Sequence, residues 1–265
     1  MWRVIGASEQ GTSHVQHNLP CQDAFAWKII DDSLMIAVAD GLGSAIKAEQ
    51  AARAIVEEAL HLFSNKQAAF AQQQGEQDQD QEQDQEALLR SIFVEARALL
   101  QQIAAIEEAS LKDYASTFLV AILHPKGFIA GQIGDGAMVV KKSDNSLQLV
   151  NIPQQGEYIN ETIPITADNA LDALSITAYH GEIQAFAVFS DGLQNLALDM
   201  VKQTPYEPFF TPLFKIASDV SFDTDYTSAQ LAGFLRSERI CQRTDDDKTL
   251  VLAACIADTP KSETS

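Results

Sequence analysis

The segment SLMIAVADG, residues 33–41, is an apolar run that stops at an Asp-Gly pair, and the same arrangement returns later in the chain. The run before it, AFAWKII (24–30), is separated from it only by Asp31-Asp32. This spacing predicts a β-hairpin, because two short apolar strands flank a turn. Asp135-Gly136 follows the run FIAGQIG, and Asp191-Gly192 follows AFAVFS. Apolar strands that end in Asp-Gly are therefore a recurring feature of this sequence.

The remaining segments read partly as strands and partly as helices. Residues 46–63 and 87–108 each carry an apolar stripe at helical spacing, and helices are also predicted near 208–217 and at 227–239, where Thr227 or Ser228 can cap. Short apolar runs predict further strands at 117–123, 127–133, 136–141, 146–151, 174–179, 183–189 and 249–256. Many strands around few helices, without a regular βαβ alternation, predict an α+β fold of antiparallel sheet covered by helices.

One segment has a different composition from the rest. Residues 72–86 contain eight Gln, six acidic residues and one Gly, with no apolar side chain. Such a segment buries too little surface to offset its ordering entropy, so we expect a disordered insertion that serves as a solvated linker between two helices or as a partner-binding segment. We expect one domain over residues 1–258, interrupted by this insertion, and a tail at 259–265.

The net charge of the chain excludes some classes of binding partner. The 265 residues include 18 Lys and Arg against 37 Asp and Glu, a net charge of −19, and 46% are hydrophobic. Nucleic acids and anionic membranes attract basic surfaces, so neither is expected as a partner. The three cysteines are far apart, the N-terminus has no signal-peptide pattern, and no apolar run approaches the ~20 residues that span a bilayer. We therefore expect a cytoplasmic protein.

The aspartates carry the strongest functional signal. A lone Asp-Gly pair usually marks a turn, but here several carboxylates stand at strand ends, with Asp23 before the first hairpin strand and Asp245-Asp246-Asp247 before the last strand. If the fold brings these ends together, the carboxylates repel one another unless a cation binds. Mg²⁺ and Mn²⁺ prefer such oxygen ligands, whereas the five histidines show no zinc-ligand spacing.

Six short motifs then point to a known family. They are CQD (21–23), VADGLGSA (38–45), ASTFLVA (115–121), GQIGDG (131–136), FSDGL (189–193) and TDDDKT (244–249). Their order resembles that of the metal-dependent type-2C protein phosphatases (PPM), most closely the compact bacterial branch. The resemblance runs from about residue 8 to residue 256 and implies a four-layer sandwich of two antiparallel sheets flanked by helix pairs.

The resemblance also implies a role for each matching residue. Asp40 corresponds to the carboxylate that bridges two metal ions, and Gly41 to the glycine whose carbonyl binds one of them. Asp191 and Asp246 correspond to further ligands, so Asp40, Asp191 and Asp246 form the expected catalytic set. The other correspondences are Asp23, which holds metal through water, Asp135, which binds a third and weaker ion, and Thr117, which lines the site near the substrate phosphate.

The N-terminal region departs from the family pattern. Family members carry a phosphate-binding Arg about five residues before the first acid, and here Asn18 stands at that spacing. His14 and His17 are nearby donors that could replace it. The candidates for binding the substrate phosphate are therefore His14, His17, Asn18 and Thr117.

The resemblance predicts a protein serine/threonine phosphatase. Two Mg²⁺ or Mn²⁺ ions that share a carboxylate lower the pKa of a water, which then attacks phosphorus in a phosphoserine or phosphothreonine monoester. The implied partners are a phosphorylated protein and a cognate Ser/Thr kinase. Two alternatives stay open: a pseudophosphatase, in which the fold binds without turnover, and a hydrolase of small phosphate esters.

Overall fold

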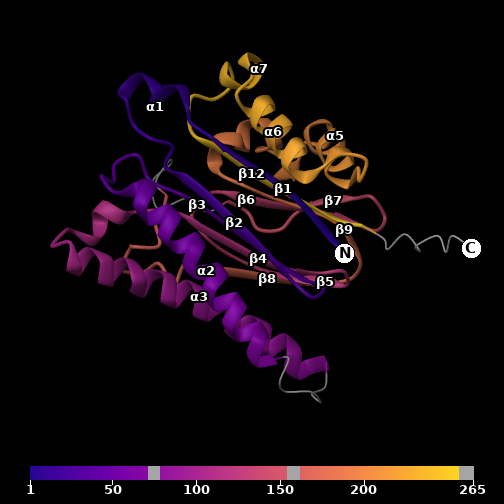
Figure 1. The fold of residues 1–265 in the computed structure, drawn as a ribbon, viewed down its shortest axis with the longest axis horizontal. Coiled ribbons are helices and arrows are strands. Elements are labelled where there is room, and N and C mark those ends of the chain that lie inside the picture. The colour runs from indigo at the N-terminus through magenta and orange to yellow at the C-terminus, as the bar shows by residue number, and fades with distance from the viewer. Residues whose placement is uncertain (71–77, 154–161, 257–265) are drawn as a thin grey trace, which may run out of the picture.

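The strands form two five-stranded antiparallel sheets (Figure 1) in the computed structural model, which describes residues 1–70, 78–153 and 162–256. The first sheet has the order β2-β3-β4-β5-β8, with strands Asp23–Ile30, Ser33–Asp40, Phe118–His124, Gly127–Ile133 and Ser175–His180. The second has the order β1-β12-β9-β6-β7, with strands Trp2–Glu9, Lys248–Cys255, Ile183–Phe189, Ala137–Lys142 and Leu147–Leu149. A short ribbon pairs β10 (Leu198–Asp199) with β11 (Thr204–Pro205).

Helices cover the outer face of each sheet. Helices α2 (Ala48–Phe70) and α3 (Asp78–Ile106) lie along the first sheet, and α5 (Glu207–Ser218) and α6 (Thr224–Leu235) lie on the second (Figure 1). The short elements are α1 (Thr12–His17), α4 (Gln194–Ala197), α7 (Glu238–Cys241) and the 3₁₀ turns η1 (Leu111–Tyr114) and η2 (Asp191–Leu193). The predicted α+β sandwich of two antiparallel sheets flanked by helix pairs is confirmed.

The space between the sheets is filled by apolar side chains that point inward from both. Val38 and Leu119 from the first sheet meet Phe186 and Val251 from the second, and all four are fully buried. Alternation explains this layer, because every second residue of a strand faces the same side. The layer ends where the strands reach the carboxylates.

The predicted hairpin is confirmed, since β2 and β3 pair antiparallel with Ile30 opposite Ser33. Two other boundaries differ from the expectation. Helix α6 starts at Thr224 rather than at Thr227 or Ser228, because the Asp223 carboxylate accepts hydrogen bonds from the backbone N–H groups of residues 225 and 226. The chain then breaks before α7, so 227–239 is not one helix.

The described part of the insertion expected to be disordered at 72–86 is helical. Residues 78–86 form the first turns of α3, which fits the good helix propensity of Gln and Glu. Residues 72–77 lie outside the described part of the chain, as does the expected tail at 259–265. In the described ranges, no helix combines the length and the apolar character that crossing a membrane requires.

Candidate active site

The first polar residues of the site lie two positions beyond the last apolar residues that point into the space between the sheets. Along β3 the inward series runs to Val38 and then to Asp40, and along β9 it runs to Val188 and then to Ser190. The register sets Asp23 directly opposite Asp40. The hydroxyl of Ser190 donates a hydrogen bond of 2.7 Å to Asp23 Oδ2, which joins the two sheets at this end.

The remaining carboxylates come from the loops at the same end. Asp191 follows β9, Asp246 precedes β12, and Asp135 lies where the chain crosses from β5 in one sheet to β6 in the other. These loops surround a cavity of about 300 Å³. Most of the residues expected in the site line it: His14, Asp40, Gly41, Thr117, Asp135, Asp191 and Asp246. Asp23 lies behind this lining and is buried.

Burial, together with the neighbouring charges, raises the pKa values of these carboxylates. Burial raises the pKa of Asp40 well above its usual range, and the charges of Asp23 and Asp191 raise it further. Burial raises the pKa of Asp23 to about 7, although hydrogen bonds from Ser190 and Thr249 act in the opposite direction. Burial and the charge of Asp135 raise the pKa of Asp191 to about 6. Negative charge on this cluster therefore lowers the free energy of unfolding.

The donor set fits a hard divalent cation. The charges of Asp23 and Asp191 act on Asp40, and one buried oxygen of each of those two, Oδ1, has no hydrogen-bond partner. Unpartnered buried carboxylate oxygens and raised pKa values both favour a bound cation, and ligands that are all oxygen favour Mg²⁺ or Mn²⁺ over zinc. Among the described residues, no three acidic, His or Cys side chains already surround a single point as ligands.

The backbone around Asp40 is fixed by its neighbours in the next strand. The Thr117 hydroxyl accepts a hydrogen bond of 3.1 Å from the Asp40 N–H, and the Thr117 N–H donates to the Asp40 carbonyl at 2.7 Å. The Ser116 hydroxyl donates to the same carbonyl at 3.0 Å. Thr117 thus lines the cavity and also holds the position of Asp40.

The glycines that follow two of the aspartates allow close packing. A Cβ on Gly41 would lie 2.6 Å from the Cβ of Ala48, and one on Gly192 would lie 2.0 Å from the Asp247 carbonyl oxygen. A side chain at either position would push the neighbouring aspartate out of place. Close approach of protein atoms therefore requires a glycine at these two positions.

Only His14 of the three N-terminal candidates reaches the cavity. It is buried in α1, and its Nδ1 lies 2.8 Å from Asp247 Oδ2, an ion-pair contact rather than an aligned hydrogen bond. His17 is exposed, with its Nδ1 2.8 Å from the Ser13 carbonyl oxygen. Asn18 is exposed and ends α1 with φ 54°. Neither His17 nor Asn18 lines the cavity, because the short helix turns both outward.

Sequence reasoning missed the residues that support the site. Asp247 accepts backbone N–H bonds of 2.6 Å from Gly11 and from Gln22, so it ties the N-terminal segment to the last strand. Lys248 is fully buried, and its Nζ donates to the Asp246 carbonyl at 3.0 Å. Alternation along β12 could have separated Asp247, which shares the inward face of Thr249 and Val251, from its neighbour Asp246.

Asp135 is held by two further residues that sequence analysis did not select. The Thr162 hydroxyl donates to its carboxylate, and the Gln194 side chain donates to its backbone carbonyl. Thr162 also lines the cavity. No motif marks either residue, and both lie far from Asp135 in the sequence.

Comparison with known proteins places these features in context. The protein-family model described as Protein phosphatase 2C matches residues 10–236. Serine/threonine-protein phosphatase 3 of Escherichia coli (strain K12) is 38% identical over 258 residues, which cover 95% of this chain and 98% of that protein.

Solved structures agree on the fold. A bacterial serine phosphatase superposes with a TM-score of 0.63 at 14% identity, over 98% of this chain and 100% of that one. The serine/threonine phosphatase Stp1 from Staphylococcus aureus superposes with a TM-score of 0.62 at 14% identity, over 97% and 96% of the two chains. At this level of identity the structural likeness speaks for the fold alone.

Proposed function

This chain belongs to the protein phosphatase 2C family, and we propose that the aspartates at one end of its sandwich carry out the reaction of that family. The chain is a metal-dependent serine/threonine protein phosphatase, and phosphoproteins are its substrates. The observation that supports our choice of site is the convergence of aspartates from both sheets on one cavity of about 300 Å³, with raised pKa values at its centre.

We assign the metal site to the aspartates at this end of the sandwich. Asp40 would be shared between two ions, because it lies opposite Asp23 in the sheet and the charges of both Asp23 and Asp191 act on it. The other proposed ligands are Asp191, Asp246, the Gly41 carbonyl, Asp23 through water, and Asp135 for a third and weaker ion. Mg²⁺ or Mn²⁺ would neutralise the phosphate oxygens and lower the pKa of the water that attacks phosphorus.

We propose that His14 takes the place of a phosphate-binding arginine. Its Nδ1 faces Asp247, so Nε2 is the ring atom left for the cavity. Asp247 is itself fixed by the N–H groups of Gly11 and Gln22, and this second layer of contacts holds the orientation of the imidazole. His14 can then donate a hydrogen bond to a phosphate oxygen, while Thr117 positions the opposite wall.

Hydrolysis of p-nitrophenyl phosphate tests this assignment. The wild type should need Mn²⁺ or Mg²⁺ and lose activity on chelation, and Asp40→Ala and Asp191→Ala should abolish turnover while the circular dichroism stays native. Titration calorimetry with Mn²⁺ should show binding that both variants lose. Activity that survives both substitutions would refute the proposed site.

The substrate class needs a separate comparison. Rates on phosphopeptides and on small phosphate esters, measured with the same metal, should favour the phosphopeptides. A preference for the small esters would instead support the alternative hydrolase. The cognate kinase and the cytoplasmic location stay predictions from the sequence.

A further inference from the structure

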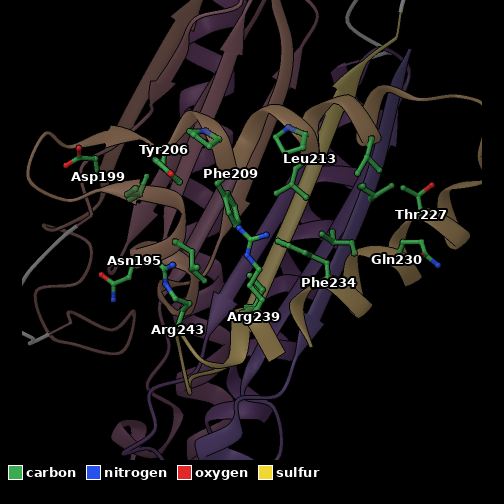
Figure 2. Close-up of a pocket in the computed structure, with 18 residues that line it drawn as sticks. Asn195, Asp199, Tyr206, Phe209, Leu213, Thr227, Gln230, Phe234, Arg239 and Arg243 are labelled. Carbon is green, nitrogen blue, oxygen red and sulfur yellow. The ribbon is translucent and has the colours of Figure 1, made fainter. Parts of the chain in front are cut away.

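A second and larger cavity lies among the C-terminal helices, on the outer face of the second sheet (Figure 2). Its volume is about 680 Å³, which falls within the range of roughly 300–1,000 Å³ that is typical of small-molecule sites. Its walls come from β1, from the segment around α4 and β10, and from α5, α6 and α7. This cavity is distinct from the one lined by carboxylates, with which it shares no lining residue.

The lining is mainly apolar and partly aromatic. Leu213 and Leu231 are buried members of the core beneath it. The rings of Phe209 and Phe234 lie with centroids 6.3 Å apart, and Phe234 is only partly buried. Tyr206 lines the same cavity and is 52% exposed. An aromatic surface that is open in this way offers a planar apolar molecule stacking contacts and burial.

Two arginines complete the lining. Figure 2 shows Arg239 and Arg243 at the α7 wall, with Arg239 directed toward Phe209. Within the described ranges, neither side chain has an ion pair or a hydrogen bond, whereas Arg236 on the same stretch lies 3.5 Å from a Glu9 carboxylate oxygen. In a chain with 37 acidic and 18 basic residues, two arginines without an acidic partner beside one cavity form a local site for an anion.

The one acidic residue in the lining does not cancel this charge. Asp199 lies at the β10 wall, and its carboxylate pairs with Lys202 at 3.0 Å. Its negative charge is therefore already balanced by a neighbouring ammonium group. The arginines remain the unbalanced charge at this cavity.

We propose that this cavity binds an aromatic molecule that carries one anionic group. The aromatic body packs against Phe234 and Tyr206, the lining rings that are not fully buried, and the anion accepts hydrogen bonds from Arg239 and Arg243. The walls continue into the loops that carry Asp191 and Asp246, so the two cavities share supporting elements. This proposal does not depend on the assignment of the catalytic residues.

Two fluorescent probes with the same body test the proposal. 1-Anilinonaphthalene-8-sulfonate has the anion, and N-phenyl-1-naphthylamine lacks it. The sulfonate should bind saturably with 1:1 stoichiometry. The double variant Arg239→Gln/Arg243→Gln should weaken its binding about tenfold or more, while binding of the neutral probe should change less than about twofold.

Arg236→Gln is the matched control and should leave both probes unchanged. Both cavity arginines are exposed, so the double variant should fold, and its circular dichroism checks this. If it does not fold, each single variant should weaken the sulfonate about threefold. The proposal is overturned if the sulfonate shows no saturable binding, if the arginine variants leave its binding unchanged, or if they weaken both probes equally.

Discussion

The middle of the sandwich and its carboxylate end are built from the same strands with opposite chemistry. On β3 the inward residues Ile36 and Val38 are fully buried and apolar, and the next inward residue is Asp40. On β12 the inward Val251 is followed, toward the cavity, by Thr249 and then Asp247. One or two steps of alternation thus separate residues that stabilise the fold from residues placed for chemistry.

The two regions should respond to substitution in opposite ways. A buried apolar side chain contributes packing and burial, so its removal lowers the free energy of unfolding. A carboxylate with a raised pKa lowers the free energy of unfolding at neutral pH, whether it stays charged or takes up a proton, so its removal stabilises the metal-free protein. The middle of the layer between the sheets therefore stabilises the fold, and its carboxylate end serves function.

Asp40→Asn should give the largest effect and should act on function alone. We expect kcat/KM for p-nitrophenyl phosphate to fall about 10³-fold or more, because a shared metal ligand is lost. The same change should leave the metal-free protein as stable as the wild type or more stable at about pH 8, because it removes an ionisable group whose pKa the folded cluster raises. Enzyme assays and urea denaturation in EDTA measure the two quantities.

The exposed Asp172→Asn is the control for this pair of measurements and should change neither of them. A marked loss of stability in Asp40→Asn without metal would mean that the carboxylate supports the fold. The contrast between the two regions would then be wrong.

Phe186→Ala should give the opposite result. Phe186 is fully buried between the sheets, and its truncation should lower the free energy of unfolding by about 3–5 kcal/mol. Because it is remote from the carboxylates, kcat per folded molecule should stay near the wild-type value well below the midpoint temperature. Phe222→Ala, at a residue that is 53% exposed, is the matched control and should cost about 1 kcal/mol or less.

The alternation of these strands was also the part of the fold that sequence could predict. Apolar runs around Asp31-Asp32 specified the hairpin, and the resemblance of its motifs identified the layers around it. Strand β1 was missed because Gly6 weakens its pattern, and only the structure explains this glycine: a Cβ there would lie 2.6 Å from the Phe25 ring. A contact with a neighbouring strand leaves no mark on local sequence.

The site was predictable to the same extent. Asp-Gly pairs at strand ends marked Asp40, Asp135 and Asp191, since their positions follow from the strands themselves. The choice between His14 and His17 was not predictable, because it depends on Asp247, which is more than 200 residues away in the chain. Residues fixed by strand order can be inferred from sequence, and residues fixed by long-range contacts cannot.

The stability of the metal-free protein should also depend on pH. The pKa of Asp is about 3.9 in unfolded chains, and the folded protein raises that of Asp191 to about 6 and that of Asp23 to about 7. The folded state therefore favours the protonated forms, so the stability that they contribute is present in acid and is lost as pH rises through these values. Between about pH 5 and about pH 8 we expect a loss on the order of a few kcal/mol.

Urea denaturation in EDTA at both pH values measures this loss. Saturating Mg²⁺ should remove most of it, because a bound cation favours the charged carboxylates that the empty cluster disfavours. The core variant Phe186→Ala should keep the same pH dependence, since its defect lies elsewhere. Stability that increases toward about pH 8 without metal would contradict the electrostatic account of the cluster.

The smallest expected effect is a difference in KM between substitutions of two histidines in the same short helix. His14→Gln should raise KM for a phosphopeptide about tenfold, equivalent to ~1.4 kcal/mol, with a smaller change in kcat, because His14 lines the cavity and is proposed to hold the substrate phosphate. His17→Gln, three residues on and exposed, should change neither constant more than about twofold. Asp247→Asn should act in the same direction as His14→Gln and more weakly, because it loosens the imidazole without removing it. Steady-state kinetics with fixed Mn²⁺ give all three values. A KM that His14→Gln leaves unchanged would show that the carboxylate end binds phosphate without the contribution of this helix.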